Sequence, residues 1–317
     1  MHLHPDMAAA LDTLDPAVRD CGPVLEMLAR QGRSALGLRT PLAAPDSQTD
    51  EGVDVRTVTL DSREDGSSLR VRRYRPEGAA VQPALVYFHG GGFVFGAPED
   101  EDLRCIFYAR EAACTVLSVD YRLAPEHPYP TGLEDCILAW QSITRQAAAL
   151  GIDSARMALG GASAGGGLAA ATAIALRDLG LPPPLLQLLI YPVLDDRLDT
   201  PSMHSSGDTP VWNRKTARQS WAMYLGQAGK GAVPDTAAPA RASNLSGLPP
   251  AYLATAEHDP LRDEGLNFGL RLLQHGIPVE LHSYAGTLHG FDVLATGSKL
   301  AQGALQEQAR ALVDALH

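Results

Sequence analysis

Short apolar runs that alternate with helix-like segments constrain the fold of this chain more than any other feature of its sequence. Each run ends in turn residues, and helical spacing of apolar positions follows it, as in a helix packed on a sheet. The runs cover residues 84–88, 115–119, 157–159, 185–190, 252–256 and 279–284. This alternation is typical of βαβ units, which build a mostly parallel central sheet with helices on both faces. We therefore expect an α/β fold whose ligands gather at the carboxyl ends of the strands.

Two segments fit this alternation poorly, namely residues 1–45 and about 198–228. We expect them to form a helical cap over the strand ends, the first as an N-terminal segment and the second as an insertion in a catalytic domain of residues 46–317. The second segment contains Trp212 and Trp221. Both are candidates for lining a substrate pocket, although aromatic residues at helical spacing are also typical of ordinary packing.

The charge and the N-terminal sequence exclude two broad classes of function. The 317 residues carry 26 Lys and Arg against 37 Asp and Glu, a net charge of −11, and the basic residues form no block. Nucleic-acid binding needs clustered Lys and Arg, so no nucleic acid is expected as a partner. Asp6 and Asp12 stand where a signal peptide would carry positive charge and an apolar run, and no apolar stretch of 18 residues occurs. We expect a cytoplasmic protein without a membrane span.

The four cysteines predict neither a metal site nor a redox pair. Cys21, Cys105, Cys114 and Cys136 show no C-x-x-C pairing and no histidine at the spacing of a zinc site. We expect reduced, mostly buried thiols and no bound metal.

A Gly-x-Ser-x-Gly pattern stands between a predicted strand and an alanine-rich predicted helix. Its residues are Gly161, Ala162, Ser163, Ala164 and Gly165. A nucleophile elbow needs this context, because the glycines leave room for a strained turn that lifts the serine hydroxyl from the sheet. A phosphate-binding loop is the alternative, but the stretch lacks the Lys-Ser or Lys-Thr of a P-loop and the spacing of a dinucleotide fingerprint. Ser163 is the predicted nucleophile.

A serine nucleophile needs an imidazole to take its proton and a carboxylate to orient that imidazole. Asp259 follows the predicted strand at 252–256, and His289 follows the one at 279–284. Both side chains are thus expected at the carboxyl ends of strands. The order Ser163, Asp259, His289 is the order used by α/β-hydrolases.

Four other residues compete for the roles of base and acid. His258 is adjacent to Asp259, where the backbone directs neighbouring side chains apart, and His282 lies inside a predicted strand. Asp263 and Glu264 fall in the next predicted helix, where carboxylates favour capping its start. We therefore retain Asp259 and His289.

Three consecutive glycines follow His89, and they predict that another group approaches the main chain closely at this point. Glycine costs about 0.5–1 kcal/mol relative to alanine in ordered backbone, although glycine-rich turns also simply end strands. Attack on an ester carbonyl creates an oxyanion, which preorganised N–H groups must meet at about 2.7–3.1 Å. The N–H groups of Gly91, Gly92 and Ala164 are predicted to form this hole, a device of lipases and esterases. His89 is predicted to shape the loop rather than carry a proton.

Five motifs in one order resemble the bacterial hormone-sensitive-lipase-like, or family IV, carboxylesterases. They are "HGGGF" at 89–93, "DYRLAPEHPYP" at 120–130, "GASAGGG" at 161–167, "DPLRDEG" at 259–265 and "LHGF" at 288–291. The resemblance implies a capped α/β-hydrolase that acts on esters of short acyl chains without a metal or organic cofactor. It also implies that Glu126 lies near the nucleophile and supports its surroundings. Ala162 departs from the family, which usually has Asp or Thr there.

These observations predict a serine carboxylic ester hydrolase that cleaves short- to medium-chain acyl esters through an acyl-enzyme. The expected partner is a small-molecule ester, and a homodimer is possible. Two alternatives remain. An amidase or arylformamidase would use the same triad, and a non-catalytic ligand-binding receptor would use the same scaffold. The presence of His289 counts against the receptor, because the receptors that resemble this family have lost that histidine.

Overall fold

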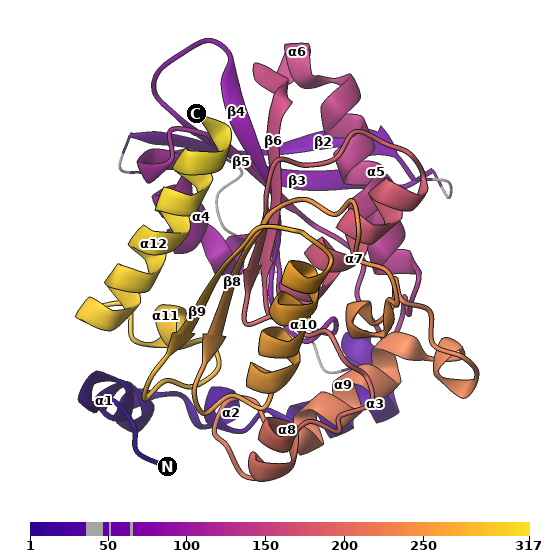
Figure 1. Cartoon of the computed structure of the whole chain (residues 1–317), viewed down its shortest axis with the longest axis vertical. Coiled ribbons are helices and arrows are strands. Elements are labelled where there is room, and N and C mark those ends of the chain that lie inside the picture. The colour runs from indigo at the N-terminus through magenta and orange to yellow at the C-terminus, as the bar shows by residue number, and fades with distance from the viewer. Residues whose placement is uncertain (36–46, 51, 64–65) are drawn as a thin grey trace.

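A nine-stranded sheet runs through the part of the chain that the computed structural model describes, which is residues 1–35, 47–50, 52–63 and 66–317 (Figure 1). The strands are β1 (Ser47–Asp50), β2 (Val53–Ser62), β3 (Ser68–Pro76), β4 (Gln82–Phe88), β5 (Thr115–Val119), β6 (Ile152–Ala162), β7 (Gln187–Ile190), β8 (Ala251–Ala256) and β9 (Val279–Tyr284). Their order in the sheet is β1-β2-β3-β5-β4-β6-β7-β8-β9. Five of the six apolar runs lie wholly in strands, and the run at 185–190 extends two residues before β7.

The sheet is parallel from β5 to β9 and antiparallel over its first three strands. The predicted run at 157–159 covers only part of β6, because the first half of this strand exposes Ser154 and Ala155 while the second half is buried. Hydrophobicity therefore marks where β6 enters the core and not where it begins. The predicted α/β fold with a mostly parallel sheet is confirmed.

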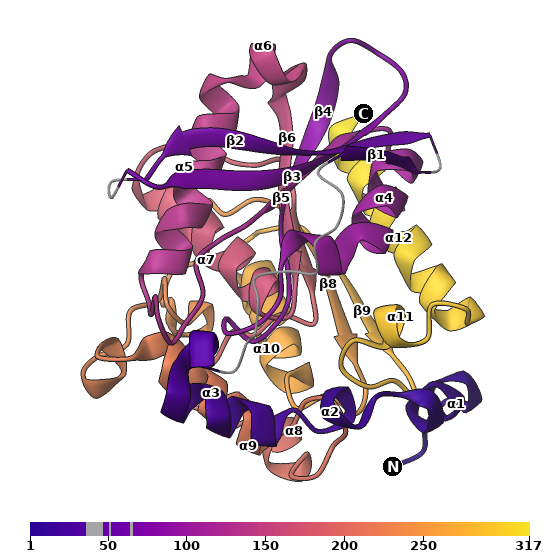
Figure 2. The same ribbon diagram turned by 180° about the vertical axis from the view of Figure 1, so that it is seen from behind.

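Helices cover both faces of the sheet and the carboxyl ends of its strands. The α-helices of the described residues are α1 (Pro5–Thr13), α2 (Pro16–Arg19), α3 (Gly22–Ala35), α4 (Asp102–Glu111), α5 (Thr131–Arg145), α6 (Ala147–Leu150), α7 (Ala164–Asp178), α8 (Pro201–Ser205), α9 (Arg214–Leu225), α10 (Arg262–Gln274), α11 (Phe291–Leu294) and α12 (Lys299–Leu316). Helices α5, α7 and α10 pack on one face, and α4 and α12 pack on the other (Figures 1 and 2). Each face has its own cluster of buried apolar side chains.

Helix α7 is buried over almost its whole length, from Ala164 to Leu176. Its sequence is rich in alanine and glycine, and small side chains allow close approach to β6 and to α5. A helix that is apolar on all sides belongs in the interior of a protein. Its first residue follows Ser163, so the core itself fixes the position of the predicted nucleophile.

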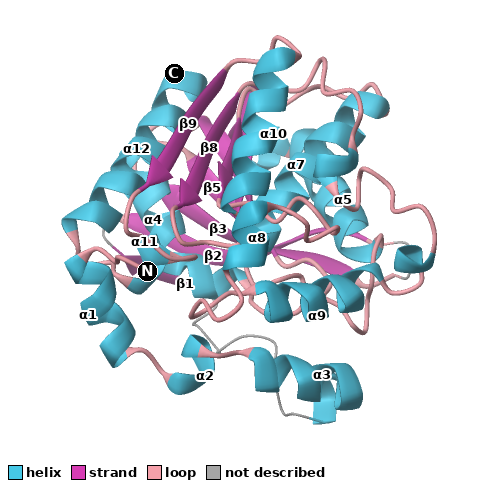
Figure 3. Ribbon diagram, turned by 60° about the horizontal axis from the view of Figure 1, so that its bottom comes forward, coloured by secondary structure: helices cyan, strands magenta, loops and turns pink. Residues whose placement is uncertain are grey.

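The remaining helices except α6 lie at the carboxyl ends of the strands, and α6 lies at the opposite end, before β6 (Figures 1 and 3). The N-terminal helices α2 and α3 lie beside α8 and α9, and the Val211 N–H donates to the Arg19 carbonyl at 2.9 Å. The two segments predicted to form a cap thus meet each other. Residues 36–45 of the first segment lie outside the described residues, and the division into domains stays a prediction. Among the described helices, none is both long and apolar enough to span a bilayer.

Candidate active site

Ser163 occupies a sharp turn between β6 and α7. Its backbone has φ 57° and ψ −119°, a combination that is strained for a residue with a side chain. Hydrogen bonds on both sides hold this conformation. The Ser163 N–H donates to the Ile190 carbonyl at 2.8 Å, and the Ser163 carbonyl accepts from Gly167 at 3.1 Å and Val193 at 3.0 Å. This is the geometry predicted for a nucleophile elbow.

Gly165 makes the turn sterically possible. A Cβ at this position would overlap the carbonyl oxygen of Phe88 at the end of β4. The start of α7 therefore crosses the neighbouring strand at a distance that only glycine allows. The second glycine of the Gly-x-Ser-x-Gly pattern is thus required by close packing of the helix on the sheet.

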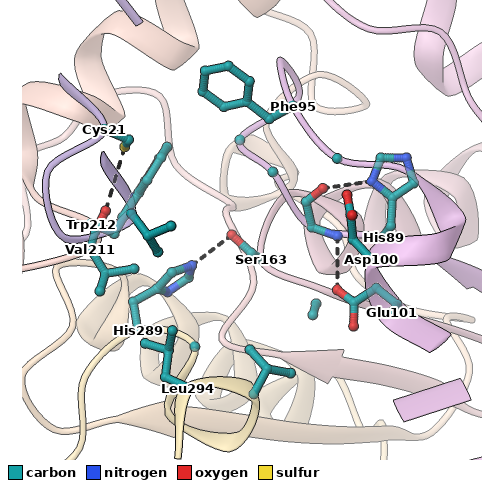
Figure 4. A pocket seen from close by; sticks show the side chains of 18 of the residues that line it. Cys21, His89, Phe95, Asp100, Glu101, Ser163, Val211, Trp212, His289 and Leu294 are labelled. Carbon is teal, nitrogen blue, oxygen red and sulfur yellow. Dashed lines mark hydrogen bonds between the residues drawn. The ribbon is translucent and has the colours of Figure 1, made fainter. Parts of the chain in front are cut away.

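The side chains of Ser163, His289 and Asp259 come from separate loops and meet in one line of contacts, and Figure 4 shows the bond between the first two. His289 Nε2 lies 2.8 Å from Ser163 Oγ, and His289 Nδ1 lies 2.6 Å from Asp259 Oδ2. The other Asp259 oxygen accepts the Leu261 N–H at 2.9 Å, which fixes the carboxylate plane. All three polar side chains are less than a tenth exposed. The order and spacing match a nucleophile, a base and an orienting acid.

The competing histidines face other partners. His258 Nε2 lies 3.0 Å from the carbonyl of His2 in the N-terminal segment. His282 Nε2 lies 2.8 Å from a Glu280 carboxylate oxygen on the same strand. Neither lines the pocket that contains Ser163.

The competing carboxylates also bond elsewhere, and the expectation that they cap α10 is wrong. Asp263 accepts the Ser202 N–H at 2.7 Å. Glu264 is buried and accepts the N–H groups of Leu194 at 2.7 Å and Asp195 at 3.2 Å. Burial raises the pKa of Glu264 well above its ordinary value. Asp263 ties α10 to the first turn of α8, and Glu264 ties it to the loop after β7, because these segments carry buried N–H groups that need an acceptor.

Gly91 and Gly92 line the pocket beside Ser163. Gly91 has φ 114°, and a Cβ on it would overlap the carbonyl oxygen of Phe95. Among the described residues, no acceptor takes the N–H of either glycine, and the Ala164 N–H is the first of its helix and has no intrahelical partner. Unpaired N–H groups next to a serine hydroxyl are what an oxyanion hole requires.

His89 contributes to the pocket wall beside the glycine loop, and its ring packs against Tyr121. The two rings stack with centroids 4.2 Å apart, and the Tyr121 hydroxyl donates to the His89 carbonyl at 2.8 Å. His89 Nδ1 lies 2.7 Å from the Gly90 carbonyl. Burial lowers the pKa of the imidazole, which favours its neutral form. These contacts fit a residue that shapes the loop.

Glu126 is not among the residues that line the pocket. Its carboxylate accepts the backbone N–H of Arg33 at 2.6 Å. The Arg33 guanidinium in turn donates to the carbonyl oxygens of Val94 and Ala124. Glu126 and Arg33 therefore connect the end of α3 to the segment that follows the glycine loop. The family motif marks a structural contact here, and the implied support of the nucleophile's surroundings stays a prediction.

The pocket that contains Ser163 and His289 has a volume of about 610 Å³ and walls that are mostly apolar. Trp212 is part of its wall, whereas Trp221 is not. Trp221 packs against Phe93 and Tyr224, with ring centroids at 5.5 and 5.7 Å. The two candidate tryptophans thus differ, one facing the cavity and the other facing the core.

Several pocket residues were not predicted from the sequence. The wall opposite the strand ends is built by Ala17, Val18, Cys21 and Val24 of the N-terminal segment, together with Val211. Small apolar side chains in short helices carry no chemical signature. Only their position in the predicted cap could have assigned them to the pocket wall. In the described ranges, no group of three or more His, Cys, Asp and Glu side chains is arranged to hold a metal ion.

Comparison with known proteins identifies the family. A family model described as the alpha/beta hydrolase fold matches residues 85–293. Carboxylesterase NlhH of Mycobacterium tuberculosis is 39% identical over 284 residues, which are 88% of this chain and 87% of that protein. Ethyl acetate hydrolase of Pseudomonas putida is 36% identical over 298 residues, which are 92% of each. The solved structure of a bacterial heroin esterase has a TM-score of 0.87 and 40% identity, and the match covers 100% of this chain and 98% of that one.

The chain belongs to the alpha/beta hydrolase family, in its hormone-sensitive-lipase-like branch of serine esterases. The predicted family and enzyme class are confirmed. The relatives and the solved structure are named for ester hydrolysis. They therefore favour the ester-hydrolase prediction over the amidase, arylformamidase and receptor alternatives.

Proposed function

We propose that this chain hydrolyses carboxylic esters through an acyl-enzyme formed on Ser163. The observation that carries the proposal is the continuous chain of contacts from Ser163 Oγ through the His289 ring to Asp259, at 2.8 and 2.6 Å. A serine hydroxyl is a poor nucleophile by itself, and an imidazole within hydrogen-bond distance removes its proton during attack. Asp259 selects the tautomer that leaves Nε2 free to accept that proton.

In the first half-reaction, Ser163 Oγ attacks the ester carbonyl carbon while His289 takes the hydroxyl proton. The carbonyl oxygen becomes an oxyanion, which the N–H groups of Gly91, Gly92 and Ala164 stabilise. The tetrahedral intermediate then collapses, the bond to the alcohol oxygen breaks, and His289 gives its proton to the departing alcohol. In the second half-reaction, water attacks the acyl-enzyme with His289 again as the base, and the acid product leaves Ser163 free.

The substrates that we propose carry short to medium acyl chains. A mostly apolar cavity of about 610 Å³ rewards each added methylene by about 0.8 kcal/mol until the chain reaches the wall, after which overpacking opposes binding. The relative named for ethyl acetate hydrolysis supports a small acyl group. We expect kcat/KM to be highest at roughly four to eight acyl carbons and to fall beyond about ten.

A panel of p-nitrophenyl esters from acetate to palmitate, run beside matched p-nitroanilides, tests both parts of the proposal. We expect hydrolysis of the esters, little hydrolysis of the anilides, and ester turnover lowered by about 10³-fold or more in Ser163→Ala. Highest activity on palmitate would indicate a long open groove instead of a closed pocket. Preference for the anilides would favour an amidase with the same triad.

We also propose a cap made of residues 1–45 and about 198–228, a cytoplasmic location and a homodimer. Burial raises the pKa of Cys114 to about 12 and leaves this thiol unreactive. The outer edge of β9 pairs with no strand among the described residues, so a second copy could add to it. Sedimentation analysis tests the dimer, and fractionation of the source cells tests the location.

A further inference from the structure

A buried arginine outside the triad is hydrogen-bonded to three separate segments next to the pocket. Arg104 lies in α4 and is only 2% exposed. Its Nη1 donates to Asp292 Oδ2 at 2.9 Å, and its Nη2 donates to the Tyr191 hydroxyl at 2.9 Å. Its Nε donates to a Glu101 carboxylate oxygen at 2.8 Å. None of these four residues was a candidate site residue in the sequence.

Two of the partners hold the loop that carries His289. Asp292 lies three residues after His289, at the start of α11, and is completely buried. The Tyr191 hydroxyl donates to Asp292 Oδ1 at 2.6 Å. The Tyr191 ring meets the His289 ring edge to face, with centroids 4.8 Å apart. The network therefore contacts the imidazole directly and also fixes the loop behind it.

The third partner holds the glycine loop. Glu101 Oε1 accepts the Gly90 N–H at 3.3 Å, and Gly90 precedes the two glycines assigned to the oxyanion hole. Figure 4 shows Glu101 on one side of Ser163 and His289 on the other. Arg104 thus joins the two halves of the site through one rigid, planar guanidinium.

The buried charges in this network oppose any displacement of the loops that it connects. Burial alone would raise the pKa of Asp292, but the Arg104 charge and the hydrogen bond from Tyr191 outweigh it and lower that pKa. Asp292 is therefore ionised, and Arg104 is charged. A buried charge that loses its partner is strongly destabilising, so neither loop can shift without breaking a charged hydrogen bond. Such a network fixes the relative position of the two loops more than it adds to the free energy of unfolding.

We propose that Arg104, Glu101, Asp292 and Tyr191 form a positioning network that holds the histidine loop and the oxyanion loop in register across Ser163. The proposal rests on the proposed function, which gives these two loops their catalytic roles. None of the four residues transfers a proton or touches the reacting bond. Their effect is on the placement of His289 Nε2 and of the glycine N–H groups, to which turnover is sensitive at the scale of an ångström.

A second Arg-Asp-Tyr cluster in the same protein provides a matched control. Arg72 is 1% exposed and donates to Asp102 Oδ1 at 2.8 Å. The Tyr74 hydroxyl donates to that same oxygen at 2.6 Å, the distance found between Tyr191 and Asp292. Neither Arg72 nor Tyr74 lines the pocket. Both clusters contact the start of α4. Arg72 and Tyr74 tie it to β3 through Asp102, whereas Arg104 ties it to the histidine loop through Asp292.

The deciding comparison is Tyr191→Phe against Tyr74→Phe, because each removes one buried hydroxyl and keeps the ring. For p-nitrophenyl butyrate at a temperature well below either Tm, Tyr191→Phe should lower kcat roughly 10- to 100-fold with KM nearly constant. Tyr74→Phe should leave kcat within about twofold although its Tm also falls. Asp292→Asn is a second variant and should repeat the loss in kcat.

A phosphonate inhibitor that labels Ser163 gives an independent readout. Titration counts folded, competent sites, and the rate constant of labelling reports alignment at each site. We expect Tyr191→Phe to keep the full count of sites and to label more slowly in proportion to its loss in kcat. Equal kcat in the two tyrosine variants, or a reduced count with a normal labelling rate, would overturn the positioning role. Full activity of Ser163→Ala would instead overturn the proposed function itself, so the two failures are distinguishable.

Discussion

The loops at the strand ends and the helices that cover them are held in different ways. The side chains of Ser163, Asp259 and His289 are buried and joined by hydrogen bonds of 2.8 and 2.6 Å. The covering helices α3 and α9 are joined by an ion pair between Glu26 and Lys215 whose side chains are 43% and 64% exposed, and by a small apolar cluster. Buried polar geometry fixes the strand-end loops, whereas the contact between α3 and α9 combines an exposed ion pair with apolar packing.

This difference separates chemistry from substrate selection. Proton transfer needs atoms within hydrogen-bond distance, so the strand-end loops tolerate little displacement. The cap contributes apolar wall to the pocket, and apolar contacts depend on volume more than on direction. Substitutions at the strand ends should therefore change kcat, whereas substitutions in the cap should change which ester is preferred.

The largest effect that we expect comes from the triad. Ser163→Ala and His289→Ala should each lower ester turnover by about 10³-fold or more, and Asp259→Asn should lower it severely, because each removes a member of one proton-transfer unit. Turnover of p-nitrophenyl butyrate and the Tm of each variant are the measurements. Near-normal turnover by a folded Ser163→Ala protein, free of contaminating esterase, would contradict the assignment of the chemistry to the strand-end loops.

The two tryptophans of the second cap segment give the next largest effect. Trp212 lines the pocket, so Trp212→Ala should lengthen the preferred acyl chain and raise the octanoate-to-butyrate ratio of kcat/KM about tenfold, the worth of one or two extra methylenes at about 0.8 kcal/mol each. Trp221 packs in the core, so Trp221→Ala should cost about 3–5 kcal/mol of stability and leave this ratio unchanged.

Trp221→Ala is thus the matched control for Trp212→Ala. Kinetics over the ester series and denaturant unfolding of both variants separate pocket from packing. A shift in chain-length preference in both variants, or in neither, would mean that the pocket wall is not divided between the two tryptophans in this way.

The same difference explains how much the sequence could predict. The strands and the positions of Ser163, Asp259 and His289 follow from apolar runs, turn residues and chain order, which are local features. Arg104 and Asp292 are 188 positions apart and bond only because α4 and α11 pack near each other in the fold. The pocket wall at Val18 and Val24 also depends on long-range packing, because an aliphatic residue does not indicate what its side chain will face. Long-range contacts between such residues are not encoded in any short motif.

A substitution at Ala162, which precedes the nucleophile, should have a smaller effect on activity. The Ala162 side chain is 2% exposed and belongs to an apolar cluster with Ile190, Tyr191 and Leu288. Ala162→Asp introduces the residue common in the family, but here it buries a carboxylate, which costs more than the about 1–3 kcal/mol of an unpaired neutral polar group. Activity should stay within roughly tenfold, because this side chain neither attacks nor donates to the oxyanion. Ala162→Asn, which adds no charge, is the control, and a folded Ala162→Asp as inactive as Ser163→Ala would contradict our account of the elbow.

The smallest effect that we expect concerns Glu126, which connects the cap to the strand-end loops. Its carboxylate accepts the Arg33 N–H and lies outside the pocket wall. Glutamine keeps a carbonyl oxygen for that N–H, so Glu126→Gln should leave kcat within about twofold, and Glu126→Ala should lower the Tm slightly more than Glu126→Gln does. Turnover of p-nitrophenyl butyrate and thermal unfolding measure both. If Glu126→Gln instead slowed turnover as much as we expect for Tyr191→Phe, this contact would reach the nucleophile after all, and the cap would take part in aligning the chemistry.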